Sequence, residues 1–458
     1  MKITVYIPIH NYGKYIKKSI DSVLKQTTAD WELIIINDGS TDNTSGILQG
    51  YLNHPKIRIV EQVNRGLSIS NNIALRLSNA KYFMRLDADD YLDENALIVM
   101  SNILDTKPKV GLVYPDYYVI DEKDEILEAV RRKKIGKEAR LLDLPAHGAC
   151  TMFRKECLLE LGGYAEEFDC QDGYGLWLKF LQSFKPYNVN IPLFYYRQHS
   201  SNLTGNYAKI LETRRKIKRN FVKDFKGNRF PKILAVIPVI KKPSAFSDSA
   251  FNMLAGKPLI WYTLSEVIKT NMLDKIVLSS DDEAVLDYAA SFKGVMPLKR
   301  PKDLTRNSTE HSEIVDNILE SIRKKENYRP DAVLFLYINT PLRRVTHIEK
   351  AIDTMAIFNV DSVISIEEEL SFCYTHNKQG LIPIQKSREL RLEKDAVYKE
   401  NGAILLSKLE SITATSFFGK KIGHIIMLPE DSVRIKSPYN MWLAEQIING
   451  WLTNGKNK

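Results

Sequence analysis

Two short stretches decide the fold class, ITVYIPI at residues 3–9 and KILAVIPV at residues 232–239. Each is an aliphatic run of strand length with an Ile-Pro pair near its end, where proline should stop the strand because it has no backbone N–H to donate. Similar aliphatic runs follow in both halves and alternate with segments in which apolar residues have helical spacing. This alternation predicts two tandem Rossmann-like α/β domains, each with a mainly parallel, doubly wound sheet.

The length of 458 residues is too great for one ordinary core and favours two domains of roughly 200 residues each. Lysine, glycine and proline collect from Gly227 to Pro231, between two periodic regions, as in a linker. We therefore predict an N-terminal domain over residues 1–226, ending in a basic helix over about residues 206–226, and a C-terminal domain over residues 231–458.

The composition is that of a soluble globular protein, with 44% hydrophobic and 26% charged residues. No apolar run reaches the roughly 20 residues of a membrane span, and the N-terminal MKITVYIPIHN enters a strand pattern without a signal-peptide core. These features predict a cytoplasmic location. The four cysteines show no CxxC pairing, so we expect free thiols and neither a disulfide framework nor a zinc site.

The net charge of +9 suits an anionic partner, whether a membrane surface, a nucleotide sugar or a nucleic acid, and does not choose among them. Much of the excess lies in the basic helix near residues 206–226. Two interpretations of that helix stay open. Its apolar side could rest on an anionic bilayer as a peripheral contact at the inner face of the membrane, or it could pack on its own domain.

Acidic residues follow two of the predicted strands in the N-terminal half. Asp38 comes after WELIIIN, and Asp87 and Asp89 come after YFMRL. Because ligands bind beyond the carboxyl ends of parallel strands, these residues should lie where a substrate binds. Mg²⁺ and Mn²⁺ prefer oxygen ligands and often use one or two carboxylates plus substrate phosphates. A lone Asp-x-Asp is more often a helix cap or turn, but a second acidic strand end favours a metal and nucleotide site.

The N-terminal half resembles the family 2 glycosyltransferases, which have the GT-A fold. The resemblance covers roughly residues 1–210 and rests on YIPIHNYGKYIKKSIDSVLKQT, IIINDGSTDNT, NRGLSISNNIAL, RLDADD, FRKECLLELGGY and YRQHSSNLT. It implies a metal-dependent, inverting glycosyltransferase that uses Mn²⁺ or Mg²⁺. It also implies a nucleotide-sugar donor, with UDP favoured, a glycan or lipid-linked acceptor of surface-polysaccharide assembly, and no nucleic acid partner.

The same resemblance assigns residues to the site. His199 falls where such enzymes supply a further metal or diphosphate contact, although a histidine that satisfies loop backbone is an equal alternative. Asp89 is the other implied metal ligand. The residues implied to bind the nucleotide are Pro8, His10, Asn11, Asp38, Asn64, Arg65 and Asp87.

Inverting transfer needs a base that takes the proton of the acceptor hydroxyl. Asp172, in the stretch CQDGYGLW, is our candidate, but Gln171 and Gly175 depart from the family's usual acidic pattern. The register therefore stays open, with Asp169 or Glu167 as alternatives. A simple N-cap role for Asp172 is compatible with the base role. His147 is a further candidate for an acceptor or donor contact, with a plain loop role as likely an alternative.

The C-terminal half resembles cytidylyltransferases of the CMP-N-acetylneuraminate synthetase type. The resemblance runs from Lys232 to about Ile448 and rests on stretches such as LAGKPLIWYTL, INTPLRRVTHIEKAI, YKENGAILL and IIMLPEDSVRIKSPYNMWLAE. It implies a nucleotidyltransferase-like fold and a homodimer formed through this domain. Arg343 and Asn401 match parts of the family that shape the nucleotide and sugar pocket.

Two departures from that family remove its chemistry. The phosphate-binding loop, Pro238 to Leu254, contains none of the family's glycines, and only Lys241 and Lys242 could still attract an anion. Arg434 and Lys436 replace the two acids that hold the family's catalytic metal. Like charges ~4 Å apart cost about 4 kcal/mol at an effective dielectric constant near 20, which opposes metal binding.

We therefore predict that the C-terminal domain is a non-catalytic relative that serves dimerisation or binds a ligand or partner. In one variant of this prediction, the two cations replace the metal and steady an anionic ligand without turnover. Two alternatives stay open. The domain could be an active CMP-sugar synthetase that makes the chain bifunctional, or a docking module for a protein of the same pathway.

Overall fold

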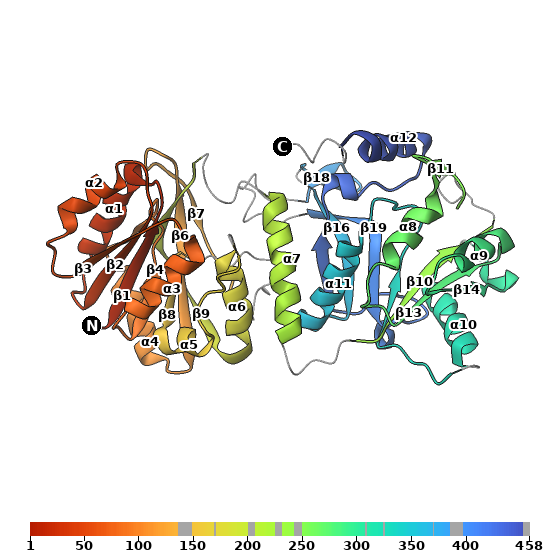
Figure 1. The fold of residues 1–458 in the computed structure, drawn as a ribbon, viewed down its shortest axis with the longest axis horizontal. Coiled ribbons are helices and arrows are strands. Elements are labelled where there is room, and N and C mark those ends of the chain that lie inside the picture. The colour runs from red at the N-terminus through yellow and green to blue at the C-terminus, as the bar shows by residue number, and fades with distance from the viewer. Residues whose placement is uncertain are drawn as a thin grey trace. The chain divides into compact units, whose positions relative to one another are not determined.

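The computed structural model describes residues 1–135, 149–168, 171–199, 207–224, 231–241, 250–306, 309–323, 326–369, 371–384 and 397–451. The chain divides into two compact units, Met1–Phe221 and Val222–Lys458, which follow one another along the colour bar of Figure 1. The division falls within the basic helix, a few residues before the linker expected at residues 227–231. Each unit is a mixed α/β domain with a mainly parallel sheet, as the sequence predicts.

The first unit is built on one large sheet. In chain order its elements are β1 (Ile3–Ile9), α1 (Gly13–Leu24), β2 (Trp31–Asp38), α2 (Thr44–Leu48), β3 (Ile57–Gln62), α3 (Leu67–Leu77), β4 (Tyr82–Arg85), β5 (Tyr91–Leu92), α4 (Ala96–Thr106), β6 (Val110–Ile120), β7 (Ile126–Val130), β8 (Met152–Arg154), α5 (Lys155–Glu160), α6 (Asp172–Ser183), β9 (Lys185–Arg197) and most of α7 (Tyr207–Asp224). The strands lie in the order β3-β2-β1-β4-β8-β6-β9-β5, and β7 pairs with β6. The first four are parallel, so their carboxyl ends meet at one edge.

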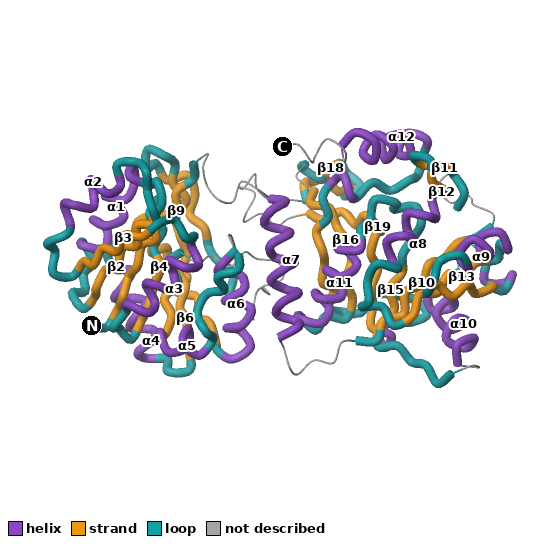
Figure 2. The backbone as a smooth tube through the Cα atoms, in the orientation of Figure 1, coloured by secondary structure: helices purple, strands orange, loops and turns teal. Residues whose placement is uncertain are grey.

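Alternation of apolar residues along β1 and β2 builds the main core of this unit. Ile3, Val5 and Ile7 are fully buried and pack with the apolar residues of α1, such as Ile16 and Ile20. Figure 2 shows helices on either side of the strands in each unit, the arrangement that a doubly wound sheet requires.

The second unit repeats this plan. Its elements are β10 (Ile233–Val239), β11 (Met253–Leu254), β12 (Lys257–Pro258), α8 (Leu259–Val267), β13 (Lys275–Ser280), α9 (Glu283–Ala290), β14 (Val295–Lys299), α10 (His311–Arg323), β15 (Ala332–Phe335), α11 (Val345–Phe358), β16 (Ser362–Glu369), β17 (Tyr374–His376), β18 (Leu381–Pro383), β19 (Val397–Lys408), β20 (Ile422–Ile426) and α12 (Pro438–Gln446). The main sheet has the order β14-β13-β10-β15-β19-β16-β20, and β17 and β18 form a separate hairpin. Again the first four strands are parallel.

The expectation that proline stops β1 and β10 is wrong by one residue, since the strands run on to Ile9 and Val239. The backbone geometry explains why. The backbone polar groups of Pro8 point toward the same neighbouring strand as those of Tyr6, which is β4. Because β4 pairs with β1 only as far as Tyr6, no neighbouring strand needs an N–H from Pro8. Pro238 stands in the same relation to β15.

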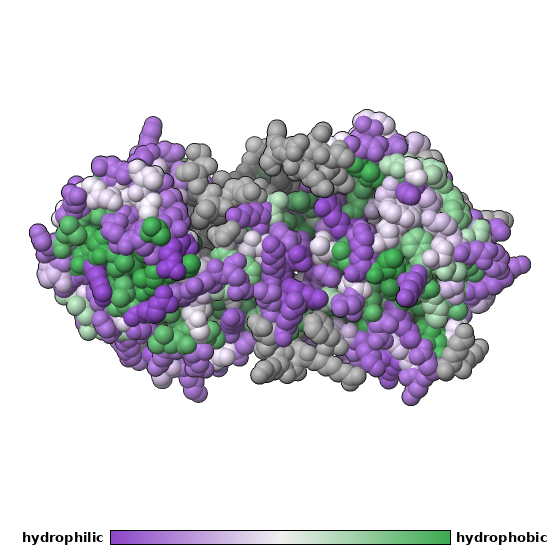
Figure 3. All heavy atoms as spheres, viewed as in Figure 1, coloured by the Kyte–Doolittle hydropathy of each residue, from purple (hydrophilic) through white to green (hydrophobic). Residues whose placement is uncertain are grey.

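The basic helix α7 packs on its own domain. Ile210 and Ile217 are buried, and Ile217 lies against Gly175 of α6. Arg214 Nε donates a hydrogen bond to the Gln171 side chain at 2.8 Å. Hydrophilic side chains cover the side of α7 that faces the viewer in Figure 3. Ile217 and Arg214 therefore contact α6 and its N-cap in the way that the packing interpretation predicts.

No helix within the described ranges combines the length and the apolar character needed to cross a bilayer. Cys150, Cys157 and Cys373 are free thiols, and Cys170 lies outside the described residues.

Candidate active site at the carboxyl edge of the first sheet

Asp38 lies at the end of β2 and holds the loop between β3 and α3. Its buried carboxylate accepts hydrogen bonds from the Gln62 side chain at 2.7 Å and from the backbone N–H groups of Arg65 and Gly66, both at 2.8 Å. Gly66 has a φ of 91°, a conformation that favours glycine. Two carboxylate oxygens have about four acceptor positions, so room remains for one further donor from a ligand. Asp38 therefore has a loop-holding role beside any ligand role.

Three other residues assigned to the nucleotide gather next to Asp38. His10 Nδ1 lies 2.8 Å from the backbone oxygen of Asp38, and Asn64 Nδ2 lies 3.3 Å from both ring nitrogens of His10. Asn11 adopts a φ of 63°, and its side-chain oxygen accepts a hydrogen bond from the backbone N–H of Thr41 at 2.7 Å. These contacts join the loops after β1, β2 and β3 into one wall at the carboxyl edge of the sheet.

Pro8 lies at the end of β1, two residues before His10, and Arg65 contributes its backbone N–H to this wall while its side chain is exposed. The structure thus brings together six of the seven residues assigned to the nucleotide. The seventh, Asp87, belongs to the acidic loop of the next strand.

The acidic loop that follows β4 contains three acidic residues, and each is held by an ion pair or a hydrogen bond. Asp87 Oδ1 lies 2.7 Å from Arg85 Nε, in an ion pair. Asp89 Oδ2 lies 2.9 Å from His199 Nε2. Asp90 is buried and accepts a hydrogen bond from the backbone N–H of Arg197 at 2.9 Å. The loop is therefore held in one arrangement before any ligand binds.

This loop concentrates negative charge. Burial, and then the charge of Asp87, raise the pKa of Asp89 against the opposing effect of its hydrogen bond with His199. Burial, and then Asp89 and Asp87, raise the pKa of Asp90 well above its usual value. Burial and the same three carboxylates raise the pKa of Tyr12 to about 12. A site in which carboxylates disfavour one another's ionisation favours a bound cation.

The residues present fit a divalent cation that completes its coordination with substrate and water. Two ligands at right angles and about 2.1 Å from Mn²⁺ or Mg²⁺ lie about 3.0 Å apart, and the Asp89–His199 pair is separated by 2.9 Å. Within the described residues, no group of three histidine, cysteine or acidic side chains could hold a metal. A cation held here by two protein ligands would leave positions open for a diphosphate.

Sequence reasoning missed three residues that support this pair. The rings of Tyr12 and Tyr15 lie 5.8 and 5.5 Å from the His199 ring. Arg197 is buried and donates from Nε to the backbone oxygen of Asp89 at 2.9 Å. The only signal in the sequence was the spacing in YRQH, which places Arg197 at the end of β9 and His199 two residues after it.

The candidate base, Asp172, stands at the start of α6. Helix α6 begins at Asp172, with Gln171 at the N-cap position and in a left-handed conformation, so the N-cap role considered for Asp172 is wrong. The side chain of Asp172 lies outside the described residues, as do Asp169 and His147. Glu167, the remaining alternative, accepts a hydrogen bond from Asn220 of α7 at 2.9 Å.

In the second unit, Arg343 and Asn401 hold the framework. The buried Arg343 donates to the hydroxyls of Thr340 and Thr263, both at 2.8 Å, and to the backbone oxygen of Ala403 at 2.9 Å. Burial lowers the pKa of Arg343 to about 9. Asn401 is also buried and bonds to the hydroxyls of Ser365 and Ser432. The two terminal nitrogens of Arg343 and the side-chain amide of Asn401 are thus engaged inside the domain, while Arg343 Nε is buried without a partner among the described residues.

The cations expected at the degenerate site of this unit are on its surface. Arg434 and Lys436 are exposed, and the Arg434 guanidinium lies against Gly402, where an added Cβ would be 3.3 Å from it. Lys241 donates its backbone N–H to Asp281 at 2.7 Å, and Lys242 lies outside the described residues.

Comparison with known proteins identifies both units. The family model "Glycosyl transferase family 2" matches residues 4–162, and the model "Cytidylyltransferase" matches residues 248–418. An uncharacterized glycosyltransferase of Rickettsia prowazekii is 30% identical over 230 residues, covering 48% of this chain and 71% of the relative. The chain belongs to glycosyl transferase family 2. Its second unit is a cytidylyltransferase domain fused to that glycosyltransferase domain.

Two further relatives match one unit each. A chondroitin synthase of Escherichia coli is 31% identical over 178 residues, covering 39% of this chain and 26% of the relative. A CMP-N,N'-diacetyllegionaminic acid synthase of Legionella pneumophila is 25% identical over 226 residues, covering 47% of this chain and 96% of the relative. The glycosyltransferase domain thus corresponds to about a quarter of the chondroitin synthase, whereas the cytidylyltransferase domain corresponds to nearly all of its relative.

Proposed function

We propose that the first unit transfers a sugar, with inversion and with the help of Mn²⁺ or Mg²⁺, from a nucleotide sugar to a glycan or lipid-linked acceptor of a surface polysaccharide. UDP is the favoured nucleotide. The observation that carries this proposal is the Asp89–His199 pair, because its 2.9 Å separation suits two ligands of one cation. Asp38 and His10 stand at the same sheet edge, where they can contact the nucleotide.

The chain's own residues divide the work of this reaction. His10, Asn64 and the loop held by Asp38 would line the nucleoside, and Arg85 keeps the Asp87 carboxylate in place by the ion pair at 2.7 Å. Asp89 and His199 would hold the cation, which stabilises the charge that develops on the leaving diphosphate. Asp172, at the first residue of α6, would take the proton from the acceptor hydroxyl, since a helix N-terminus stabilises a carboxylate.

A sugar-nucleotide screen tests the reaction and its cation. The full chain is incubated with a panel of UDP-, GDP- and CMP-sugars and with Mn²⁺, and hydrolysis or transfer is followed by mass spectrometry. We expect turnover of a UDP-sugar that stops when the cation is chelated. Turnover that persists with chelator present would remove the cation from the proposal.

The base is tested by Asp172→Asn, with Glu167→Gln as the matched control. General-base catalysis contributes about 10²- to 10⁴-fold, so turnover should fall by that factor while binding of UDP with Mn²⁺ stays unchanged. If turnover falls only in Glu167→Gln, then Glu167 is the base and Asp172 is not.

We propose that the second unit has no nucleotidyl-transfer activity and serves dimerisation or the binding of a ligand or partner. Arg434 against Gly402 supports this proposal, because a cation stands where the related enzymes carry an acid. The β17–β18 hairpin offers a dimer contact, since Tyr374, Leu381 and Ile382 are 52%, 70% and 42% exposed.

Three measurements on the full chain separate the alternatives for this unit. Light scattering should show a dimer that Leu381→Asp weakens, whereas a wild-type monomer would exclude dimerisation. Incubation with CTP and a nonulosonic acid should release no pyrophosphate, and release would instead support a bifunctional enzyme. Recovery of a specific biosynthetic protein with a monomeric chain would favour the docking module.

A further inference from the structure

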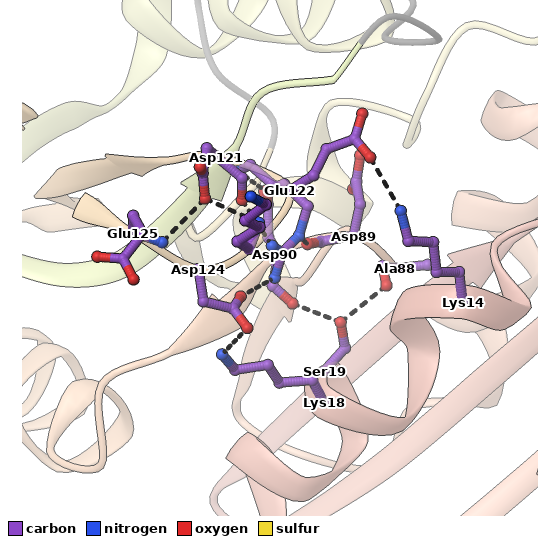
Figure 4. A network of polar contacts seen from close by, with 12 residues as sticks. Lys14, Lys18, Ser19, Ala88, Asp89, Asp90, Asp121, Glu122, Asp124 and Glu125 are labelled. Atoms are coloured by element: carbon purple, nitrogen blue, oxygen red, sulfur yellow. Dashed lines mark hydrogen bonds and ion pairs between the residues drawn. The ribbon is translucent and has the colours of Figure 1, made fainter. Parts of the chain in front are cut away.

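Arg197 occupies the centre of a polar network beside the acidic loop. This arginine is the last residue of β9 and is only 2% exposed. Besides the bond to the backbone oxygen of Asp89, its guanidinium donates to the backbone oxygen of Asp121 at 2.8 Å and to the carboxylate of Asp124 at 2.5 Å. Figure 4 shows Asp89 of the acidic loop near Asp121 and Asp124, which both belong to the turn between β6 and β7.

The turn between β6 and β7, residues 121–125, is in turn fastened to α1. The Asp124 carboxylate lies 2.8 Å from Lys18 Nζ, and Glu122 lies 2.9 Å from Lys14 Nζ. Asp121 accepts hydrogen bonds from backbone N–H groups within the turn at 2.8 and 2.9 Å, which fixes the turn's own shape. Figure 4 shows both lysines reaching this turn from their helix. Asp121 and Asp124, which accept hydrogen bonds from Arg197, are therefore held in place themselves, by the backbone of the turn and by Lys18.

The same guanidinium supports both members of the Asp89–His199 pair. It bonds directly to the backbone of Asp89, and its Cζ lies 4.8 Å from the centre of the Tyr15 ring. That ring stacks on His199 with 5.5 Å between centroids and 21° between planes. A change at Arg197 would thus move the carboxylate and the imidazole relative to each other.

A lysine could not make these contacts. The guanidinium is a rigid planar fork whose N–H groups point in fixed directions, whereas a lysine ammonium is a point charge on a flexible stem. A buried cation is costly unless it is paired and fully hydrogen-bonded, and the contacts of Arg197 meet that condition only with the fixed geometry of a guanidinium.

We propose that Arg197 is a positioning residue that sets the spacing of Asp89 and His199 for the cation, and that the turn at residues 121–125 holds Arg197 in place by its contacts with α1. This inference rests on the proposed function, because it assigns Arg197 a role toward the cation of that reaction. It adds the turn and α1 to the parts of the domain on which cation binding depends.

The test measures Mn²⁺ binding directly, without a sugar donor. Mn²⁺ is titrated into the full chain with UDP, and free Mn²⁺ is measured by its electron paramagnetic resonance signal. Removal of an outer contact to a metal ligand typically weakens metal binding about 10- to 100-fold, and we expect that range for Arg197→Lys. Asp124→Asn, which leaves the other contacts of Arg197 in place, should give a smaller shift of about threefold to tenfold.

Arg154→Lys is the matched control, since Arg154 is also buried but bonds to the backbone oxygens of Val110 and Leu104, away from the acidic loop. Its Mn²⁺ affinity should equal that of the wild type. Unchanged affinity in Arg197→Lys, or in Asp124→Asn if Arg197→Lys does not fold, would overturn the inference. A wild-type chain that binds no Mn²⁺ with UDP would instead refute the proposed function.

Discussion

The two units share a frame but differ at the edge where ligands bind. In both, the first four strands have the same parallel order, and the residue after the fourth strand donates its backbone N–H to the first. Leu86 bonds to the Tyr6 oxygen at 2.9 Å, and Leu336 bonds to the Val236 oxygen at 3.0 Å. Counting from these matched leucines, Asp87 corresponds to Tyr337, and Asp89 to Asn339.

The acid at the other strand end is kept in both units. The paired registers place Asp281, after β13, where Asp38 follows β2. Asp281 accepts the backbone N–H of Lys241 at 2.7 Å, as Asp38 accepts those of Arg65 and Gly66 at 2.8 Å. The comparison therefore separates two kinds of acid. One kind ties a loop to the sheet, and the other, present only in the first unit, is available for a cation.

The largest effect should come from replacing Asp89, whose counterpart in the second unit is Asn339. Asp89→Asn should lower turnover of the sugar nucleotide by on the order of 10³-fold, equivalent to about 4 kcal/mol, because the cation loses a charged ligand. Asn339→Ala at the corresponding position should leave turnover unchanged. Steady-state rates at saturating Mn²⁺ measure both. A large loss in Asn339→Ala would show that the second unit takes part in the reaction.

The second effect concerns stability and the framework role of Arg343. Arg343→Met should lower the free energy of unfolding of the second unit by about 3 kcal/mol, because buried oxygen atoms lose their donor. Urea titration with hydrogen exchange of α8 and β19 peptides measures this. Arg306→Met, at an exposed arginine of the same unit, should change stability by less than about 0.5 kcal/mol. Unchanged stability in Arg343→Met would contradict the framework role and favour the role in a ligand pocket that the family resemblance implies.

The third effect is a pH dependence of the second unit. Burial, and then Lys350, Arg344 and Arg343, hold the pKa of His347 well below its usual value. The unfolded chain takes up a proton below about pH 6.5 while the folded unit does not. The free energy of unfolding should therefore fall by about 1 kcal/mol as the pH drops from 6.5 to 5.5. Thermal unfolding across this range measures the slope.

His347→Gln should flatten that slope, and His376→Gln, at an exposed histidine of the same unit, should not. His311 adds a smaller slope of the same sign, since burial also lowers its pKa. Burial raises the pKa of Asp431, which acts in the opposite sense at lower pH, so the range stays above pH 5.5. A slope that survives in His347→Gln would assign it to another group.

Much of the fold followed from patterns within single segments. Alternating strands and helices predicted both sheets, and the acids after β2 and β4 predicted the edge at which they gather. Contacts between distant segments were harder to predict. Arg197 meets Asp89 only because β9 ends beside the acidic loop, and nothing near Arg343 in the sequence shows that Thr263 and Ala403 surround it. Motifs predicted which residues gather at the sheet edge, while burial decided which side chains serve the framework.

The smallest effect should follow from removing two exposed cations of the second unit, Arg434 and Lys436. Arg434 and Lys436 are exposed, and neither forms an ion pair within the described part of the chain. The double change to alanine should alter the free energy of unfolding by less than about 0.5 kcal/mol and leave sugar transfer unchanged. A tenfold loss of sugar transfer would contradict the proposal that the second unit takes no part in the reaction of the first.

The same variant shows whether the cations hold an anion. A ligand present at 100 times its dissociation constant stabilises a folded domain by about 2.7 kcal/mol, so binding of pyrophosphate should appear as a shift in the unfolding of the second unit. If the wild type shows that shift and the double variant does not, the cations have replaced a metal as the anion's partner. If neither shows it, Arg434 and Lys436 bind no pyrophosphate, and the proposal that these cations steady an anionic ligand is wrong.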